Sequence, residues 1–69
     1  MIKYFYYNNS RKSIRIDCNY PGTIVLSNVL GNITRTYSYQ ANGQWINLSS
    51  LPSGTYFAST YGSSITFIK

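Results

Sequence analysis

The chain of 69 residues contains no histidine, one acidic side chain (Asp17) and one cysteine (Cys18). Without histidine the most common general base is missing, and a single carboxylate cannot form the acid–base pair of a glycosidase or an aspartic protease. Metal sites built from histidine, cysteine or several carboxylates are excluded by the same counts. We therefore predict that the protein is not an enzyme and has no catalytic residue, no metal site and no cofactor.

Long apolar runs are also absent from the sequence. No stretch approaches the roughly 18 apolar residues of a membrane-spanning helix, and residues 2–7 are too short for the apolar region of a signal peptide. We therefore expect no insertion into a membrane. A lone cysteine forms no internal disulfide, so we expect Cys18 to be a buried or half-buried strand residue; the alternative is an exposed thiol that bridges to another molecule.

Basic side chains outnumber acidic ones by six to one, which gives a net charge of +5. Such a charge is compatible with binding to nucleic acid, an anionic membrane or an acidic glycan. Only Arg11, Lys12 and Arg15 cluster, however, and no phosphate-binding glycine loop or RNA-binding motif occurs. We interpret the charge as solubilising and expect no nucleic-acid partner.

The residues that the chain does have favour β-strands. No segment repeats apolar residues at helical spacing, whereas β-branched and aromatic residues occupy most apolar positions. Turn residues recur about every 8 to 12 positions, which is the pattern of a small β-sandwich. We predict an all-β fold, a small antiparallel β-sandwich of six to seven short strands, and a single domain over residues 1–69.

Individual segments show how the strands are expected to be delimited. Residues 13–17 alternate, with Ile14 and Ile16 on one face. The apolar run 23–30 is broken by Asn28 and closed by a turn at residues 31–32. Asn42-Gly43 is the strongest β-hairpin signal, because both residues tolerate the positive φ of a type I′ turn. Segment 33–40 is expected to place four side chains on one side of a strand: Ile33, Arg35, Tyr37 and Tyr39.

Pro52, Gly54 and Tyr56 mark the start of a strand over residues 55–60. Proline has no amide hydrogen to donate to a ladder, and glycine gives the chain freedom in φ. We interpret Tyr56 as a residue that fills the core or bonds back to the loop, like the corner tyrosine of sandwich domains. If φ is positive at Gly54, Gly54→Ala is expected to destabilise the fold more than a surface substitution does.

The aromatic residues allow two interpretations. A set helped by Arg35 could form a stacking platform for sugar or single-stranded nucleic acid. Alternatively the rings fill a small core and cover the sheet faces, which we favour. A small carbohydrate-binding or adhesion module of an extracellular protein is the alternative function that follows from the first interpretation, and a purely structural linker module is a further one. The set comprises Tyr4, Tyr6, Tyr37, Tyr39 and Trp45.

Four stretches together resemble one known family. They are YNNSRKSIRI, with Asn9 where the family usually has proline; TIVLSNVLGN, in which Gly31 matches the family's glycine; INLSSLPSGTYFAS, in which Leu51, Pro52, Gly54 and Tyr56 match its most specific motif; and ITFIK, a closing apolar strand ending on lysine. The family often has an additional lysine near the position of Thr66. Over roughly residues 7–69 the chain resembles the type A C-terminal sorting domain of type IX secretion cargo from Bacteroidota.

The resemblance implies a seven-stranded immunoglobulin-like sandwich that is the C-terminal module of a larger secreted protein. It implies a non-catalytic targeting domain that directs its cargo across the outer membrane by protein–protein recognition. The implied partners are the outer-membrane translocon, a sortase-like peptidase and the parent cargo protein. The implied destination, reached through the periplasm and the outer membrane, is the cell surface or the medium.

Within this family the last hairpin, residues 55–69, is our candidate for the recognised element. The hypothesis rests on its terminal position and on the ability of an unpaired strand edge to bind an extended partner. Polar contacts are expected from Lys69 and the terminal carboxylate. A homodimer through edge strands stays open, because such edges also pair with a second copy. The candidate recognition residues are Ile65, Phe67, Ile68 and Lys69.

Overall fold

The computed structural model describes residues 2–69, which form seven β-strands and no helix. Met1, included in the predicted domain, lies outside the described residues. The strands are β1 (Ile2–Asn8), β2 (Ser13–Cys18), β3 (Gly22–Asn28), β4 (Ile33–Tyr39), β5 (Gln44–Asn47), β6 (Thr55–Thr60) and β7 (Ser63–Ile68). The predicted all-β class is confirmed, with the upper end of the predicted strand number.

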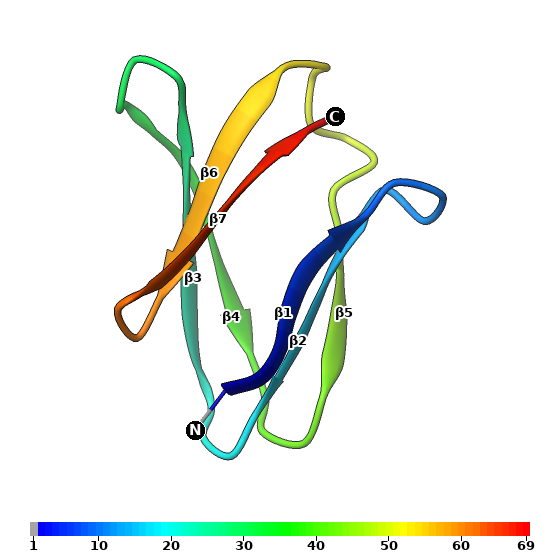
Figure 1. Ribbon diagram of the computed structural model, residues 1–69, viewed down its shortest axis with the longest axis vertical. Coiled ribbons are helices and arrows are strands. Elements are labelled where there is room, and N and C mark those ends of the chain that lie inside the picture. The colour runs from blue at the N-terminus through cyan, green and yellow to red at the C-terminus, as the bar shows by residue number, and fades with distance from the viewer. Residues whose placement is uncertain (1) are drawn as a thin grey trace.

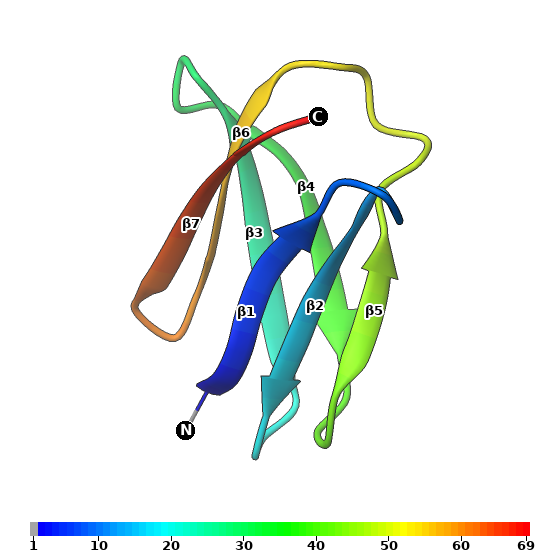
Figure 2. The ribbon, with the colours of Figure 1, turned by 45° about the vertical axis from the view of Figure 1, so that its right-hand side comes forward.

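The strands form two sheets that face each other (Figure 1). One sheet has the order β1-β2-β5 and the other has the order β4-β3-β6-β7, and every pairing is antiparallel. The turned view separates the two layers and shows β1 and β7 on the same side of the molecule (Figure 2). This arrangement confirms the predicted immunoglobulin-like β-sandwich. Its edge strands are β1 and β5 in one sheet, and β4 and β7 in the other.

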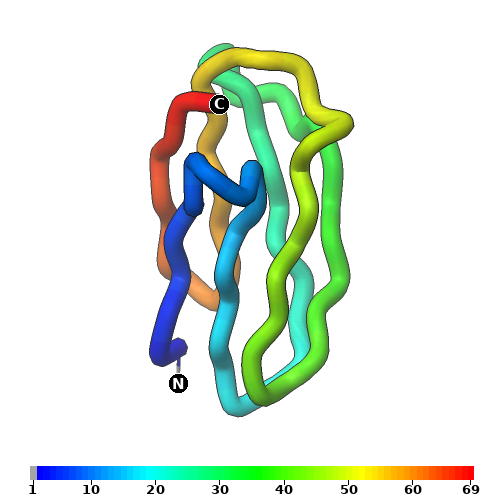
Figure 3. Tube along the Cα trace, turned by 90° about the vertical axis from the view of Figure 1, so that its right-hand side faces the viewer, coloured from blue at the N-terminus to red at the C-terminus, as the bar shows by residue number. Residues whose placement is uncertain are grey.

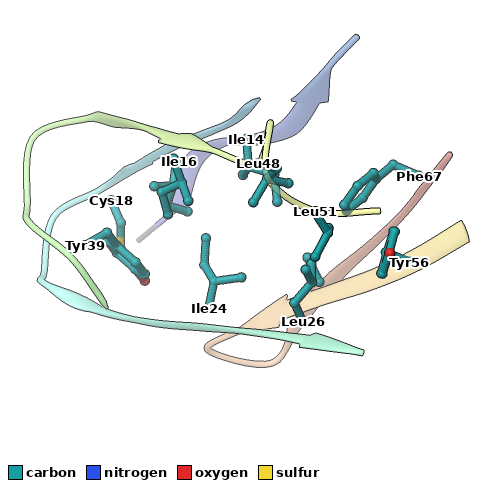
Figure 4. Close-up of a cluster of buried hydrophobic side chains, with 12 residues drawn as sticks. Ile14, Ile16, Cys18, Ile24, Leu26, Tyr39, Leu48, Leu51, Tyr56 and Phe67 are labelled. Carbon is teal, nitrogen blue, oxygen red and sulfur yellow. The ribbon is translucent and has the colours of Figure 1, made fainter. Parts of the chain in front are cut away.

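The core lies between the two sheets because alternation sends every second side chain inward. In β2, Ile14 and Ile16 are fully buried while Arg15 and Asp17 face outward, as predicted. Burying one such side chain stabilises the fold by about 1.5–3 kcal/mol. Figure 4 shows how the buried side chains of both sheets meet. They are Ile14, Ile16, Cys18, Ile46 and Leu48 from one side, Ile24, Leu26, Tyr39, Tyr56, Ala58 and Phe67 from the other, and Leu51 from a loop.

The β3–β4 connection departs from the predicted apolar run. Strand β3 ends at Asn28, and Val29 and Leu30 are 59% and 81% exposed in the turn. The cause is local, because the Asn28 side-chain oxygen accepts hydrogen bonds from the backbone N–H groups of Leu30 and Asn32. A register shift at Leu26/Ser27 then leaves Ile33 exposed, although Tyr37 and Tyr39 face inward.

The prediction of a β-hairpin at Asn42-Gly43 is wrong, because the two flanking strands do not pair with each other. The predicted backbone conformation of the two residues is confirmed. Both residues have positive φ, 71° and 92°. The strands on either side nevertheless belong to different sheets, because the Asn42 N–H bonds to the Cys18 carbonyl and the chain crosses the sandwich. The tight hairpin lies instead between β6 and β7, where Tyr61 and Gly62 have φ of 47° and 78°.

Candidate functional site

The loop that enters β6 is built around the Tyr56 side chain. Tyr56 is 6% exposed, and its hydroxyl donates a hydrogen bond of 2.7 Å to the carbonyl of Pro52. Leu51, 2% exposed, packs into the core, and its N–H bonds to the Leu48 carbonyl. Tyr56 is therefore a corner tyrosine that fills the core and bonds back to the loop, as the sequence predicted.

Lys69 closes this loop from the other side. Its N–H donates to the Gly54 carbonyl at 2.8 Å, and its main-chain oxygen accepts from the Gly54 N–H at 3.0 Å. The Lys69 Nζ also donates to the Leu51 carbonyl at 2.6 Å. Figure 3 shows the loop crossing from one sheet to the other at the end of the sandwich where Lys69 lies. Residues 51–56 and the end of β7 thus form one unit, which we call the loop clamp.

Gly54 and Gly31 have different places at this end of the molecule. Gly54 has a positive φ of 157°, which residues with a side chain rarely adopt, although an added Cβ would lie 3.7 Å from the Tyr56 ring, an ordinary contact. Gly31 lies in the β3–β4 turn, and the space beside it is open. The structure therefore brings Leu51, Pro52, Gly54 and Tyr56 together with Lys69, whereas Gly31 belongs to a separate turn at the same end (Figure 1).

The four candidate recognition residues divide by exposure. Phe67 is 6% exposed and stacks between Tyr7 and Tyr56, with ring centroids 4.4 and 5.8 Å away. Ile65 is half-buried against the same core, whereas Ile68 is 74% exposed. Of the three apolar candidates, Ile68 is therefore the one whose side chain a partner can reach directly.

The free edge of β7 is carried by three residues, of which one, Ile68, is a recognition candidate from the sequence. Gly54 and Lys69 exchange two hydrogen bonds, and such pairs alternate with unbonded pairs along an antiparallel ladder. In the β6–β7 register the unbonded positions of β7 are Ser64, Thr66 and Ile68. Their N–H and C=O groups therefore point away from β6, toward the open edge. The alternation of SSITFI predicts which side chains face outward, but only the ladder shows which amides do.

The outer face beside this edge carries no charge. Neighbouring outward positions in register are Ser59 with Ser64, Phe57 with Thr66, and Thr55 with Ile68. Phe57 and Ile68 are the large apolar side chains exposed there, at 39% and 74%. An uncharged, six-residue edge strand of this kind is a template for pairing with another extended segment.

The described residues contain no arrangement that resembles a catalytic or metal centre. No group of three or more His, Cys, Asp or Glu side chains gathers within residues 2–69. A pocket of about 380 Å³ at the opposite end is lined by Ile2, Cys18, Tyr20, Tyr61 and Ser63, none of which is charged. Burial raises the pKa of Tyr39, while its hydrogen bond with Thr60 opposes that change, and this pair lies in the core.

Among residues 2–69 there is also no helix long and apolar enough to cross a bilayer.

The aromatic stacking platform considered from the sequence does not form as one surface. Tyr39 is 2% exposed in the core, and Tyr37 is half-buried. Arg35, on the four-stranded sheet, bonds to the Ser50 hydroxyl. Three of the aromatic residues, Tyr4, Tyr6 and Trp45, lie instead on the outward side of the three-stranded sheet.

Comparison with known proteins identifies one related family. The family model described as "Secretion system C-terminal sorting domain" matches residues 5–69 of this chain. No curated protein matches the sequence. The matched range includes all of β2 to β7 and the loop clamp.

Proposed function

We propose, because this chain belongs to the family of secretion system C-terminal sorting domains, that it is the sorting module of a longer cargo protein of the type IX secretion system. The observation that carries the proposal is the family match over residues 5–69. The family is one of sorting signals and not of enzymes, so the module acts by being recognised. Export through the outer membrane delivers the cargo to the cell surface or to the medium.

The proposed partner is the outer-membrane translocon, and a sortase-like peptidase acts on the exported cargo. The hairpin of β6 and β7 is the surface that we assign to translocon recognition. An extended segment of the partner adds to β7 as a further strand, bonded to the outward amides of Ser64, Thr66 and Ile68. The uncharged outer face supports this assignment, because it places no repulsive charge beside the added strand.

The candidate recognition residues then have two roles. Ile68 contacts the partner through its exposed side chain. Ile65 and Phe67 fix β7 on the core, and Lys69 holds the loop clamp through its bond to Leu51. This division explains why β7, whose edge is open to a partner, has apolar side chains at alternate positions that face the core.

A reporter fusion tests the sorting function. Residues 1–69 are placed after a periplasmic reporter enzyme in a bacterium with a working type IX system. We expect reporter activity at the cell surface or in the medium, and periplasmic retention when the same strain lacks the translocon. The matched control is the reporter without the domain. Retention of the complete fusion in the competent strain would contradict the proposal.

A proline substitution tests the assigned edge separately. Thr66→Pro removes an N–H that points away from β6, so the β6–β7 ladder keeps its hydrogen bonds. Export is expected to fall several-fold, because a partner strand loses one hydrogen bond worth about 1 kcal/mol. Thr66→Ala, which alters the side chain but keeps the N–H, serves as the control and is expected to export normally.

Circular dichroism and a thermal melt establish that Thr66→Pro is folded. Ser64→Pro removes the neighbouring outward N–H and provides a second variant. Normal export of a folded proline variant would exclude β7 as the docking edge, while the sorting function, tested by the fusion, would still stand.

A further inference from the structure

A second surface lies on the outward face of the three-stranded sheet, away from β7. Tyr6, Arg15 and Trp45 are in register across β1, β2 and β5, so their side chains form one row. Tyr6 meets Trp45 edge to face, with ring centroids 6.1 Å apart. From the β1–β2 turn, Arg11 folds back so that its Cζ is 3.9 Å from the centroid of the Trp45 ring. We call Tyr6, Arg11, Arg15 and Trp45 the cationic row.

Two guanidinium groups share the one indole of the cationic row. The Cζ of Arg15 lies 5.6 Å from the Trp45 centroid, compared with 3.9 Å for Arg11. Both distances are within the range of cation–π attraction. Contact with the ring restricts the guanidinium group in advance, so less conformational entropy is lost when its N–H donors meet a ligand. The row therefore presents two partly preorganised, planar donor groups.

The positive charge of the row is poorly neutralised by the protein itself. Among residues 2–69, the ion pair formed here joins Arg15 Nη2 to Asp17 Oδ2 at 3.9 Å, which is at the limit for such a pair. Both partners are partly accessible, with side chains 28% and 19% exposed. Arg11 is exposed, and its guanidinium has no carboxylate partner in the described part of the chain. Unused guanidinium donors match carboxylate oxygens in charge and geometry.

We propose that the cationic row binds an acidic segment of a partner protein, with carboxylate side chains bonded to Arg11 and Arg15. Charge complementarity favours this occupant, since the chain carries +5 overall and the row holds two arginines beside one weakly paired carboxylate. A sugar ring or a nucleic-acid base would need the face of Trp45 for stacking, and Arg11 covers that face. Flexible Asp or Glu side chains instead approach the guanidinium groups from their edges and leave the stack intact.

Tryptophan fluorescence gives a direct readout, because Trp45 is the single tryptophan of the chain. The 69-residue protein is titrated with a hexaglutamate peptide, with hexalysine as the charge control. We expect a saturable change in emission with hexaglutamate that weakens as salt is added, since screening reduces attraction between exposed charges. No saturable change with hexaglutamate would overturn the proposal.

Substitutions distinguish binding at the cationic row from nonspecific attraction to the net positive charge of the protein. Arg11→Gln is expected to weaken hexaglutamate binding about tenfold, the effect of losing one charge-assisted hydrogen bond. Arg35→Gln is the matched control, because it removes the same charge from the other sheet and is expected to leave affinity within about twofold. Equal losses in the two variants would show diffuse attraction and would overturn the assignment to the row.

Two further variants examine the mechanism of recognition. Arg11→Lys keeps the charge but loses the planar donor group, so affinity is expected to fall between those of the wild type and Arg11→Gln. Asp17→Asn removes the carboxylate that competes for Arg15 and is expected to tighten binding. Weaker binding by Asp17→Asn would contradict the proposal.

Titration with polygalacturonate and oligo-dT tests other classes of polyanion. If either one binds more tightly than hexaglutamate, the acidic peptide is the wrong ligand class and the proposal is overturned.

Discussion

At the scale of single residues, two buried tyrosine hydroxyls differ in what they contact. The hydroxyl of Tyr56 donates to the Pro52 carbonyl at 2.7 Å, whereas the buried hydroxyl of Tyr7 finds no hydrogen-bond partner among residues 2–69. Both rings pack against Phe67, so removing either hydroxyl leaves a similar apolar contact. Comparing the loss of the Tyr56 hydroxyl with the loss of the Tyr7 hydroxyl therefore isolates what one hydrogen bond of the loop clamp contributes to stability.

Tyr56→Phe is expected to lower the free energy of unfolding by about 0.5–1.5 kcal/mol, because the Pro52 carbonyl loses its donor. Tyr7→Phe is expected to leave stability unchanged or to raise it, since it removes an unsatisfied buried polar atom. Urea denaturation followed by circular dichroism measures both. An equal loss for the two variants would contradict the role assigned to the Tyr56 bond.

Tyr39 makes stability depend on pH in the alkaline range. Burial raises the pKa of Tyr39 above its ordinary value, an effect that the Thr60 hydrogen bond partly offsets. As pH rises past about 10, the unfolded chain releases this proton before the folded protein does, so unfolding becomes more favourable. Stability is therefore expected to be retained below about pH 10 and to fall above it. Tyr39→Phe should make the fall shallower in thermal melts across pH 8.5–11; an unchanged slope would exclude Tyr39 as its source.

At the scale of elements, glycines of similar appearance in the sequence differ in what they tolerate. Gly43 has a φ of 92°, and an added Cβ would lie 2.8 Å from Arg15 Nη2. Gly54 also has a positive φ, 157°, but its added Cβ would make an ordinary contact. Gly43→Ala is therefore expected to cost about 1–2 kcal/mol of stability, from the left-handed backbone alone.

Gly54→Ala is expected to destabilise the fold, because φ at Gly54 is positive, as the sequence-based prediction required. The loss is expected to be smaller than for Gly43→Ala, because the added Cβ of Gly54 makes ordinary contacts whereas that of Gly43 would lie 2.8 Å from Arg15 Nη2. Chemical denaturation of the two variants gives the order directly. A greater loss for Gly54→Ala would mean that the loop clamp tolerates less adjustment than its contacts indicate.

The same elements show what sequence could and could not predict. The positive φ of Asn42 and Gly43 follows from local chemistry, but the partner of the next strand depends on which sheet can bury Ile46 and Leu48. Alternation also places Ile65 and Phe67 on one face of β7, since period two is local, but Phe67, a recognition candidate from the sequence, is buried in the core. The bond from Lys69 Nζ to the Leu51 carbonyl joins residues 18 positions apart and follows from the closed sandwich, not from any short motif.

At the scale of the whole molecule, the four edge strands of residues 2–69 are protected to different extents. Strands β1 and β4 carry Lys3 and Arg35, and β5 has four residues. Charge and short length both discourage pairing between copies. Strand β7 has six residues and no charge, and its exposed Ile68 lies at an outward position. The edge that we assign to the translocon is thus also the edge most open to a second copy of the chain.

Ile68→Lys tests this consequence. In the isolated domain at high concentration we expect self-association through β7, and a charge at this exposed position is expected to suppress it. The melting temperature of the monomer should change little, because Ile68 is 74% exposed. Sedimentation velocity over a range of concentrations measures the association, with Leu30→Lys, an exposed substitution in the β3–β4 turn, as the matched control. Equal association of Ile68→Lys and Leu30→Lys would show that copies pair elsewhere, and β7 would then be free to receive a partner strand without competition.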